Sequence, residues 1–237
     1  KVELLTFDNV DGQKTFWHTA SHVLAQAVKR LYPNAKCAIG PAVDNGFYYD
    51  FDVEKPFSPE DLEKIKAEMK KIVKSGLELE RVELSPEEAE KKLEEMNEPY
   101  KVELVKEHSD KGEHITFYKQ GEFIDLCAGP HLMSVAPIKA IELTACTGAY
   151  WRGDANNAQL CRVYGVAFPK ASMLEEHLKK LEEAKLRDHN KLGRELEYFT
   201  TVDYVGQGLP ILLPKGARVV QLLQRWVEDV EQSKGCL

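Results

Sequence analysis

Three histidines and one cysteine stand in two short strings whose residue types could do chemistry together. His18 and His22 are separated by three residues, and Cys127 and His131 have the same spacing much later in the chain. Imidazole nitrogen and thiolate sulfur are ligands of tetrahedral zinc sites, and imidazoles are also common general bases near neutral pH. The spacing therefore predicts either a zinc site or an acid–base site that holds a water molecule, and it does not choose between them.

The segment around the first string has the periodicity of an amphipathic helix. Apolar residues recur at helical spacing between Thr19 and Leu31, and Pro33 ends the helix. At about 100° per residue, His18 and His22 fall on the face opposite the apolar stripe. We therefore expect the two imidazoles either to line a cleft or to lie on the solvated surface.

The second string follows a short strand. Alternation along residues 123–127 places Asp125 and Cys127 on one face and two apolar residues on the other. The dipeptide Gly129-Pro130 stops regular structure, so a turn places His131. We expect Asp125 and Cys127 to face the cleft together.

The remaining pattern predicts helices mixed with antiparallel strands. Ser58 and Ser85 each open a short charged helix, and a mostly charged helix is expected over 172–198. Strands are expected at 2–17 (a hairpin around Asp11-Gly12), 35–52, 77–84, 100–105, 114–119, 122–127, 138–146 and 159–168. The expected class is α+β: mostly antiparallel sheet around a central amphipathic helix, with a small acidic helical lobe and a long charged linker helix.

Bulk composition limits the classes of protein. The 237 residues, 43% of them apolar, suffice for one substantial core with extensions. No apolar run approaches the roughly 20 residues of a membrane span, and no signal peptide pattern is present, so we expect a soluble cytoplasmic protein without a membrane partner. Scattered cysteines without a C-x-x-C pair predict reduced thiols at Cys37, Cys127, Cys146, Cys161 and Cys236.

The net charge of −7 is unevenly distributed. Residues 51–100 carry 15 acidic and 9 basic side chains, a balance of −6, and the rest is nearly neutral. An acidic total argues against wholesale coating of nucleic acid, but it leaves a local RNA contact open.

Four motifs, in this order, resemble the editing domain of bacterial-type threonyl-tRNA synthetases. They are His18-Thr-Ala-Ser-His22, Gly46-Phe-Tyr-Tyr-Asp50, Asp125-Leu-Cys-Ala-Gly-Pro-His131 and Thr147-Gly-Ala-Tyr-Trp-Arg-Gly-Asp154. The resemblance implies the end of an N-terminal TGS-like domain at 1–16, an editing domain at 17–169 that includes the acidic lobe at 56–99, a linker helix at 170–200 and the truncated start of a class II catalytic domain at 201–237. The ATP-binding motifs of class II synthetases have no match here. ATP, Mg²⁺ and a catalytic-domain zinc are therefore expected to belong to the rest of such an enzyme, and this chain is not expected to aminoacylate by itself.

The resemblance implies post-transfer editing, the hydrolysis of serine wrongly attached to a threonine tRNA. The implied partner is the 3′ end of tRNA(Thr) carrying serine, and a full-length protein of this type is expected to be a homodimer through its catalytic domain. Matched to the family motifs, the catalytic residues are His18, Lys101 and His131, and the substrate-binding residues are His22, Asp125 and Cys127. Lys101 stands in Pro99-Tyr-Lys-Val102.

Alternatives stay open at this point. Related alanyl editing domains hold zinc with the same pattern, whereas threonyl enzymes are generally thought to work without it, so no cofactor is firm. If zinc is bound, its ligands are His18, His22, Cys127 and His131. The chain could instead be a module that binds the tRNA acceptor end and is inactive without the catalytic domain. Arg152 and Asp154 could contact RNA, or pair with each other in a structural turn.

Overall fold

A computed structural model describes residues 4–206 and 208–235 of the chain, so Cys236 lies outside the described residues. The chain divides into two compact units, Lys1–Glu175 and Glu176–Leu237. Helices are mixed with antiparallel strands, which confirms the α+β class. The four cysteines within the described ranges are free thiols. In the same ranges, no helix has the length and apolar character needed to cross a membrane.

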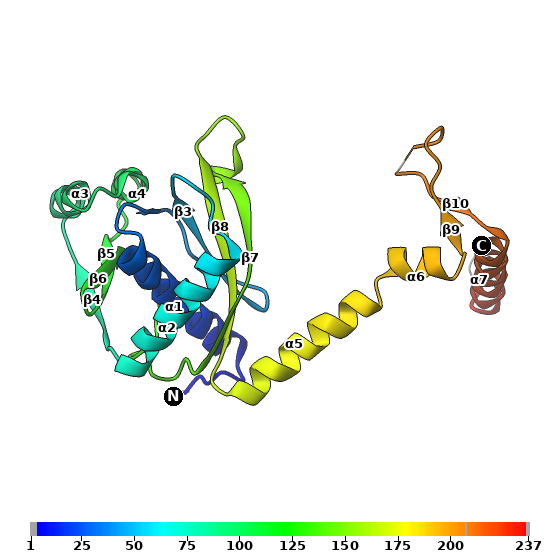
Figure 1. The fold of residues 1–237 in the computed structure, drawn as a ribbon, viewed down its shortest axis with the longest axis horizontal. Helices are drawn as coiled ribbons and strands as arrows, with labels where there is room; N and C mark the ends of the chain where they lie inside the picture. Colours follow the sequence, from blue (N-terminus) through cyan, green and yellow to red (C-terminus); the bar gives the residue numbers. More distant parts are fainter. Residues whose placement is uncertain (1–3, 207, 236–237) are drawn as a thin grey trace. The chain divides into compact units, whose positions relative to one another are not determined.

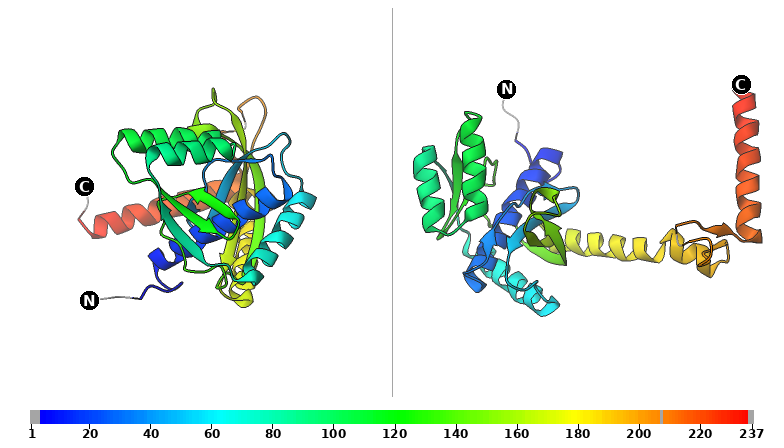
Figure 2. Two further views of the ribbon diagram at one scale, coloured as in Figure 1. Left: turned by 90° about the vertical axis from the view of Figure 1, so that its left-hand side faces the viewer. Right: turned by 90° about the horizontal axis from the view of Figure 1, so that it is seen from above.

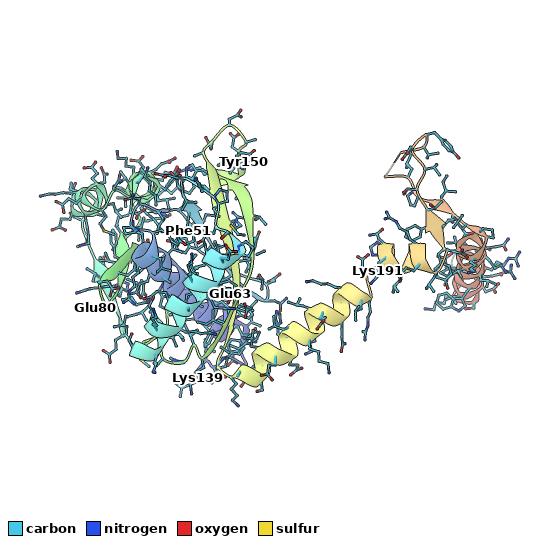
Figure 3. The ribbon with its side chains drawn as sticks, in the orientation of Figure 1. Phe51, Glu63, Glu80, Lys139, Tyr150 and Lys191 are labelled. Carbon is cyan, nitrogen blue, oxygen red and sulfur yellow. The ribbon has the colours of Figure 1, made fainter. Side chains whose placement is uncertain are left out.

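The first unit is built around helix α1 (Val10–Leu31), which runs between two antiparallel sheets (Figure 1). The larger sheet has the order β1 (Lys36–Cys37), β3 (Gly46–Asp52), β8 (Gln159–Phe168), β7 (Ala140–Tyr150), with β2 (Ala42–Val43) also paired to β3. The smaller sheet has the order β4 (Leu79–Glu83), β5 (Thr116–Gln120), β6 (Phe123–Leu126). Phe51 lies inside this unit, whereas Glu63, Glu80 and Lys139 lie at its exposed edges (Figure 3).

Helix α1 begins earlier than its apolar stripe predicts, and the hairpin predicted over 2–17 is wrong over residues 4–17, while residues 2 and 3 lie outside the described part of the chain. The segment Thr15-Phe-Trp17 has strand-forming residue types, but tertiary burial overrides that preference. Phe16 is 3% exposed, and the Trp17 indole donates a hydrogen bond to the backbone of β8. Gly12 is required because a Cβ there would lie 1.9 Å from the carbonyl oxygen of Thr6. The predicted hairpin turn is therefore the first turn of the helix.

The two Ser-Pro signals open helices as predicted. Ser58 and Ser85 each form a capping box, at the start of α2 (Pro59–Ser75) and α3 (Pro86–Glu95) respectively. Gly76 ends α2 in the left-handed conformation. Helix α2 packs its apolar residues into the main core with α1. Helix α3 instead packs beside α4 (Pro99–Asp110) over the smaller sheet (Figure 2).

The strand predicted at 100–105 is wrong, because these residues belong to α4. Alternating apolar residues at 100, 102 and 104 favour a strand, but Pro99 occupies the first turn of a helix instead. The inward positions of this helix are Lys101 and Val105, which are spaced by four and buried. Hydrophobic periodicity missed the helix because one of its inward residues is a lysine.

The second unit contains the rest of the predicted linker. A single helix over 172–198 is wrong, since α5 (Ala171–Leu186) ends before α6 (His189–Glu195). Asp188 starts the new helix by accepting a hydrogen bond from the backbone of Lys191 at 2.8 Å. Strands β9 (Phe199–Thr200) and β10 (Ile211–Leu212) pair antiparallel, and α7 (Pro214–Ser233) follows.

Candidate active site

The three histidines and the cysteine of the two strings converge on one small volume. The ligand atoms of His18, His22, Cys127 and His131 all lie within 4.8 Å of one another. Cys127 Sγ lies 3.2 Å from the Nε2 atoms of both His18 and His131. The ring centre of His131 is 4.2 Å from that of His18 and 4.2 Å from that of His22. We call these four side chains the imidazole–thiol cluster.

Local backbone structure produces this convergence. His18 and His22 are one turn apart on α1, so their rings lie on one face of the helix. His22 is 3% exposed, which excludes the solvated-surface alternative. On the other side, Gly129 has a φ of 75°, and a Cβ there would lie 2.4 Å from the Tyr118 hydroxyl oxygen. Only glycine therefore fits the turn that delivers His131.

Hydrogen-bond partners assign the tautomers of the two outer imidazoles. His18 Nδ1 lies 3.2 Å from the carbonyl oxygen of Pro130, which can only accept, so this nitrogen carries the hydrogen. His131 Nδ1 lies 3.2 Å from the Thr19 hydroxyl, whose own hydrogen is donated to a backbone carbonyl one turn earlier. Nδ1 of His131 is therefore also the donor. In the neutral form, both rings direct an Nε2 lone pair at the sulfur of Cys127.

Burial determines the protonation of the imidazole–thiol cluster. Burial lowers the pKa of His18. Burial lowers the pKa of His22 and His131 further, because neighbouring imidazoles add to the effect at these two residues. Burial also raises the pKa of the Cys127 thiol to about 11. Near neutral pH the cluster is thus three neutral imidazoles and a thiol. The single thiol hydrogen can serve one Nε2 lone pair, so the other outer imidazole keeps a lone pair free to act as a base.

A buried ion pair lies beside the cluster. Lys101 Nζ is 2.8 Å from Asp125 Oδ1, and both side chains are 5% exposed. The other carboxylate oxygen accepts a hydrogen bond from the Tyr49 hydroxyl at 2.5 Å and lies 3.8 Å from His22 Nε2. Burial by itself disfavours the charged ammonium, but the attraction of Asp125 outweighs it and raises the pKa of Lys101. Lys101 is therefore charged beside the neutral imidazoles.

The donor set of the cluster fits a zinc ion. Zinc takes imidazole nitrogen at about 2.0–2.1 Å and thiolate sulfur at about 2.3 Å, which places tetrahedral ligand atoms about 3.3–3.7 Å apart. The two sulfur–nitrogen distances of 3.2 Å are close to this spacing. The Nδ1 hydrogen bonds of His18 and His131 are also of the kind that orients metal-binding imidazoles. A bound zinc would supply Lewis acidity and lower the pKa of a bound water, and Cys127 would have to lose its proton.

All six residues predicted for the site lie together, although their roles stay predictions. They are His18 and His22 on α1, Lys101 on α4, Asp125 on β6, and Cys127 and His131 just after it. The alternation predicted for the strand is confirmed, since Asp125 is 4% exposed while Ile124 and Leu126 pack on the opposite side with the α3–α4 core.

Two residues of the site escaped sequence reasoning. Tyr49 reaches Asp125 from β3, and its alternation with the buried Phe47 and Phe51 could have placed it on the inner face. Thr19 links His131 to α1 and also accepts a hydrogen bond from the backbone of residue 132 at 2.9 Å. No sequence signal points to this role of Thr19, because its partner lies far along the chain.

Residues 151–153 form the structural turn that the sequence favours, but the alternative of an ion pair between Arg152 and Asp154 is wrong. Arg152 pairs with Glu103 at 2.9 Å and with Glu107 of α4. Asp154 accepts a hydrogen bond from the backbone of Asn156 at 2.9 Å. Arg152 therefore joins the end of the β7–β8 hairpin to α4, the helix that carries Lys101.

Part of the site lies in a segment that matches a known family. Residues 115–164 match the family described as the threonyl and alanyl tRNA synthetase second additional domain. This chain is 61% identical over 234 residues to a threonine–tRNA ligase of Clostridium perfringens (strain 13 / Type A). It is also 58% identical over 235 residues to one of Clostridium tetani and 55% identical over 234 residues to one of Acetivibrio thermocellus. Each alignment covers 99% of this chain.

Over 99% of its own length, the chain is similar to part of these threonine–tRNA ligases. It spans 36% of the length of these relatives. The matched family segment begins just before β5 and ends within β8, so it contains Asp125, Cys127 and His131. The histidines of α1 and Lys101 of α4 lie outside that segment and complete the site from earlier in the chain.

Proposed function

We propose that this cleft hydrolyses the ester of serine attached to a threonine tRNA. The observation that carries the proposal is a buried imidazole lone pair beside a charged Lys101, in a chain whose relatives are named threonine–tRNA ligases. A pocket can use one missing methyl group for only about 1–3 kcal/mol of discrimination, so an enzyme that must separate serine from threonine benefits from a second, hydrolytic sieve.

The residues of the cleft suit the steps of ester hydrolysis. The reaction needs an oriented water, a base for its proton and a donor for the developing oxyanion. Neutral His18 and His131 can take the proton, and the Lys101 ammonium can donate to the oxyanion. Asp125 and His22 can then hold the amino and hydroxyl groups of serine. No covalent intermediate is required, and the raised pKa of Cys127 disfavours a thiolate nucleophile.

A surface pocket gives the tRNA end a route to the cluster. It opens beside His18 and is lined by apolar residues, with Lys14 and Asp11 at its polar side. The apolar atoms of this pocket suit the base of a terminal nucleotide, and the Lys14 ammonium can attract its phosphate. This pocket supports entry of the acceptor end next to the imidazoles.

Zinc-assisted hydrolysis is the second candidate, and the convergence of four ligand atoms, with two of the nitrogens 3.2 Å from the sulfur, favours it. In that case the same substrate is cleaved, but His18, His22, Cys127 and His131 serve as ligands. Lys101 and Asp125 would then orient the substrate beside the metal site. The two candidates differ in whether chelation removes the activity.

The deciding experiment measures hydrolysis of seryl-tRNA(Thr) and threonyl-tRNA(Thr), with and without chelator, alongside the metal content. We expect the seryl ester to be cleaved faster, and expect His18→Ala and His131→Ala to abolish the difference. His114→Ala is the matched control, because the His114 side chain is 85% exposed and lies outside the cluster. Equal rates on both esters, or tRNA binding without cleavage by the folded parent, would overturn the proposal.

A further inference from the structure

A second ion pair, with a buried carboxylate, lies at the start of α4, three residues before Lys101. Glu98 is 3% exposed, and its Oε1 lies 2.7 Å from the Nζ atom of Lys29 on α1. Its Oε2 accepts a hydrogen bond from the backbone nitrogen of Cys37 on β1 at 2.6 Å. Lys29 also donates to the carbonyl oxygen of Ala35 at 2.9 Å. Both carboxylate oxygens of Glu98 are therefore bonded to groups outside α4.

Glu98 begins α4 through its backbone alone. Its carbonyl oxygen accepts hydrogen bonds from the backbone nitrogens of Lys101 and Val102, at 3.1 and 3.2 Å. An acidic side chain at this position often caps the first turn of its own helix, but the Glu98 carboxylate makes no such bond. The carboxylate bonds to Lys29 and Cys37 instead. Glu98 thus ties the first turn of α4 to both α1 and β1.

The rest of α4 is held by contacts that do not involve Glu98. Val105 lies in the core cluster of α3 and α4, and Leu104 packs against Trp151. The Trp151 indole donates a hydrogen bond to Glu103 at 3.0 Å. In the first turn, the Tyr100 hydroxyl also donates to Asp52 at 2.9 Å, so loss of the Glu98 contacts would shift this turn without undocking the later ones. Lys101 is the residue of the active site that lies in this first turn.

The charges from Lys29 to Asp125 alternate in sign. Lys29 pairs with Glu98, and Lys101 pairs with Asp125. Glu98, Lys29 and Asp125 line one cavity of about 300 Å³. We call the side chains of Lys29, Glu98, Lys101 and Asp125 the charged quartet. Because charges attract strongly away from water, removing one of them changes the preferred position of the next.

We propose that Glu98 is a positioning residue for the active site: by bonding to Lys29 and Cys37, it sets the first turn of α4 and so holds the Lys101 ammonium against Asp125. The catalytic part of this inference rests on the proposed function, whereas the placement of Lys101 can be tested without it. A misplacement of about 1 Å costs on the order of 100-fold in rate. We therefore expect Glu98→Gln to slow hydrolysis by about 10- to 100-fold with little change in the Kd for tRNA.

The test compares the parent chain with Glu98→Gln, Glu98→Asp and Glu103→Gln. Glu103 is the matched control: Glu103→Gln loses the same charge on the same helix, its side chain is 50% exposed, and the glutamine oxygen can still accept from the Trp151 indole. Four quantities are measured: single-turnover hydrolysis of seryl-tRNA(Thr), the Kd for tRNA, near-UV circular dichroism, and acylation of Lys101 by acetic anhydride, read by mass spectrometry. We expect Glu98→Gln to slow hydrolysis and to make Lys101 reactive toward acetic anhydride. Glu98→Asp should recover part of the hydrolysis rate and part of the protection of Lys101. Glu103→Gln should change neither the rate nor the protection.

Two results would overturn the inference. One is parent-like hydrolysis with Lys101 still protected in Glu98→Gln. The other is loss of the near-UV signal in both Glu98 variants, because Glu98 would then support the whole fold and not the placement of one side chain. If the parent itself leaves seryl-tRNA intact, the proposed function fails and Lys101 acylation alone decides. Reactive Lys101 in a folded Glu98→Gln then supports positioning, and protected Lys101 overturns it.

Discussion

The imidazole–thiol cluster and the charged quartet both lie against α1, and they satisfy their polar groups in opposite ways. In the quartet, every carboxylate faces an ammonium, at 2.7 Å for Glu98 and 2.8 Å for Asp125. In the cluster, two Nε2 lone pairs face one thiol hydrogen. A fully paired group resists change, whereas an unpaired lone pair can accept a proton or a metal.

This difference assigns separate tasks to the two regions. The quartet suits positioning, because breaking a buried ion pair is costly and its members stay in place. The cluster suits chemistry, because a neutral imidazole of lowered pKa can take a proton from water and release it again. Asp125 joins the two regions, since one of its oxygens pairs with Lys101 and the other lies 3.8 Å from His22.

The largest expected effect comes from removing a base of the cluster. His131→Ala should lower hydrolysis of seryl-tRNA(Thr) by about 10²- to 10⁴-fold, the usual contribution of general acid–base catalysis. Stability should change much less, since His18 keeps its contacts with the carbonyl oxygen of Pro130 and the sulfur of Cys127. Single-turnover kinetics and urea unfolding of the same preparation would show this contrast. If His131→Ala unfolds at a lower urea concentration than the parent but its folded form hydrolyses seryl-tRNA(Thr) at the parent rate, His131 stabilises the fold and is not the base.

The next effect comes from breaking the quartet at Lys101. Lys101→Met leaves Asp125 buried without its ammonium, and the loss of one partner of a buried pair costs about 3–5 kcal/mol of unfolding free energy. The double variant Lys101→Met/Asp125→Asn should recover part of that stability but none of the hydrolysis. Urea denaturation of both variants measures how much of the lost unfolding free energy the second substitution recovers. If the double variant is as unstable as the single one, charge pairing is not what stabilises this region.

Much of this contrast could be predicted from the sequence, because its main residues stand in local patterns. The spacing of His18 and His22 on a periodic helix, and of Asp125 on an alternating strand, identified the faces that meet in the cleft. The Ser-Pro signals likewise marked the starts of α2 and α3, since caps depend on adjacent residues. These features require only neighbouring residues to be known.

The parts that sequence reasoning missed depend on distant contacts. The sequence pattern predicts a strand in place of α4 because Lys101 occupies an inward position of this helix. A buried lysine is stable there only with Asp125 opposite. Tyr49 and Glu98 bond to residues on other elements, so no local spacing reveals their partners. The start of α1 was missed because Phe16 and Trp17 are held by tertiary packing against residues far away in the chain.

A smaller and reversible change comes from acid. Burial lowers the pKa of His18, His22 and His131 in the folded state, whereas the unfolded imidazoles keep the ordinary value of 6.5. Below about pH 6.5 the unfolded state therefore binds more protons, so the stability contributed by neutral burial is present above that pH and declines as the pH falls. Urea midpoints of the chelator-treated protein between pH 8 and 5 measure this. His22→Gln should flatten the decline, and an unchanged slope would contradict a neutral cluster.

The smallest effect tests the hydrogen assignment of the cluster. Thr19→Val keeps the shape of the side chain but removes the hydroxyl that accepts from His131 Nδ1, so the ring can adopt either tautomer. We expect about a 10-fold loss of hydrolysis, the low end of the cost of removing a group that orients an imidazole. The Cys127 contact should persist, because the turn through Gly129 still delivers His131. Nitrogen chemical shifts of the imidazoles would reveal a mixture of tautomers in Thr19→Val. A single Nδ1-protonated tautomer in that variant would mean that the turn, and not Thr19, sets the direction of the lone pair.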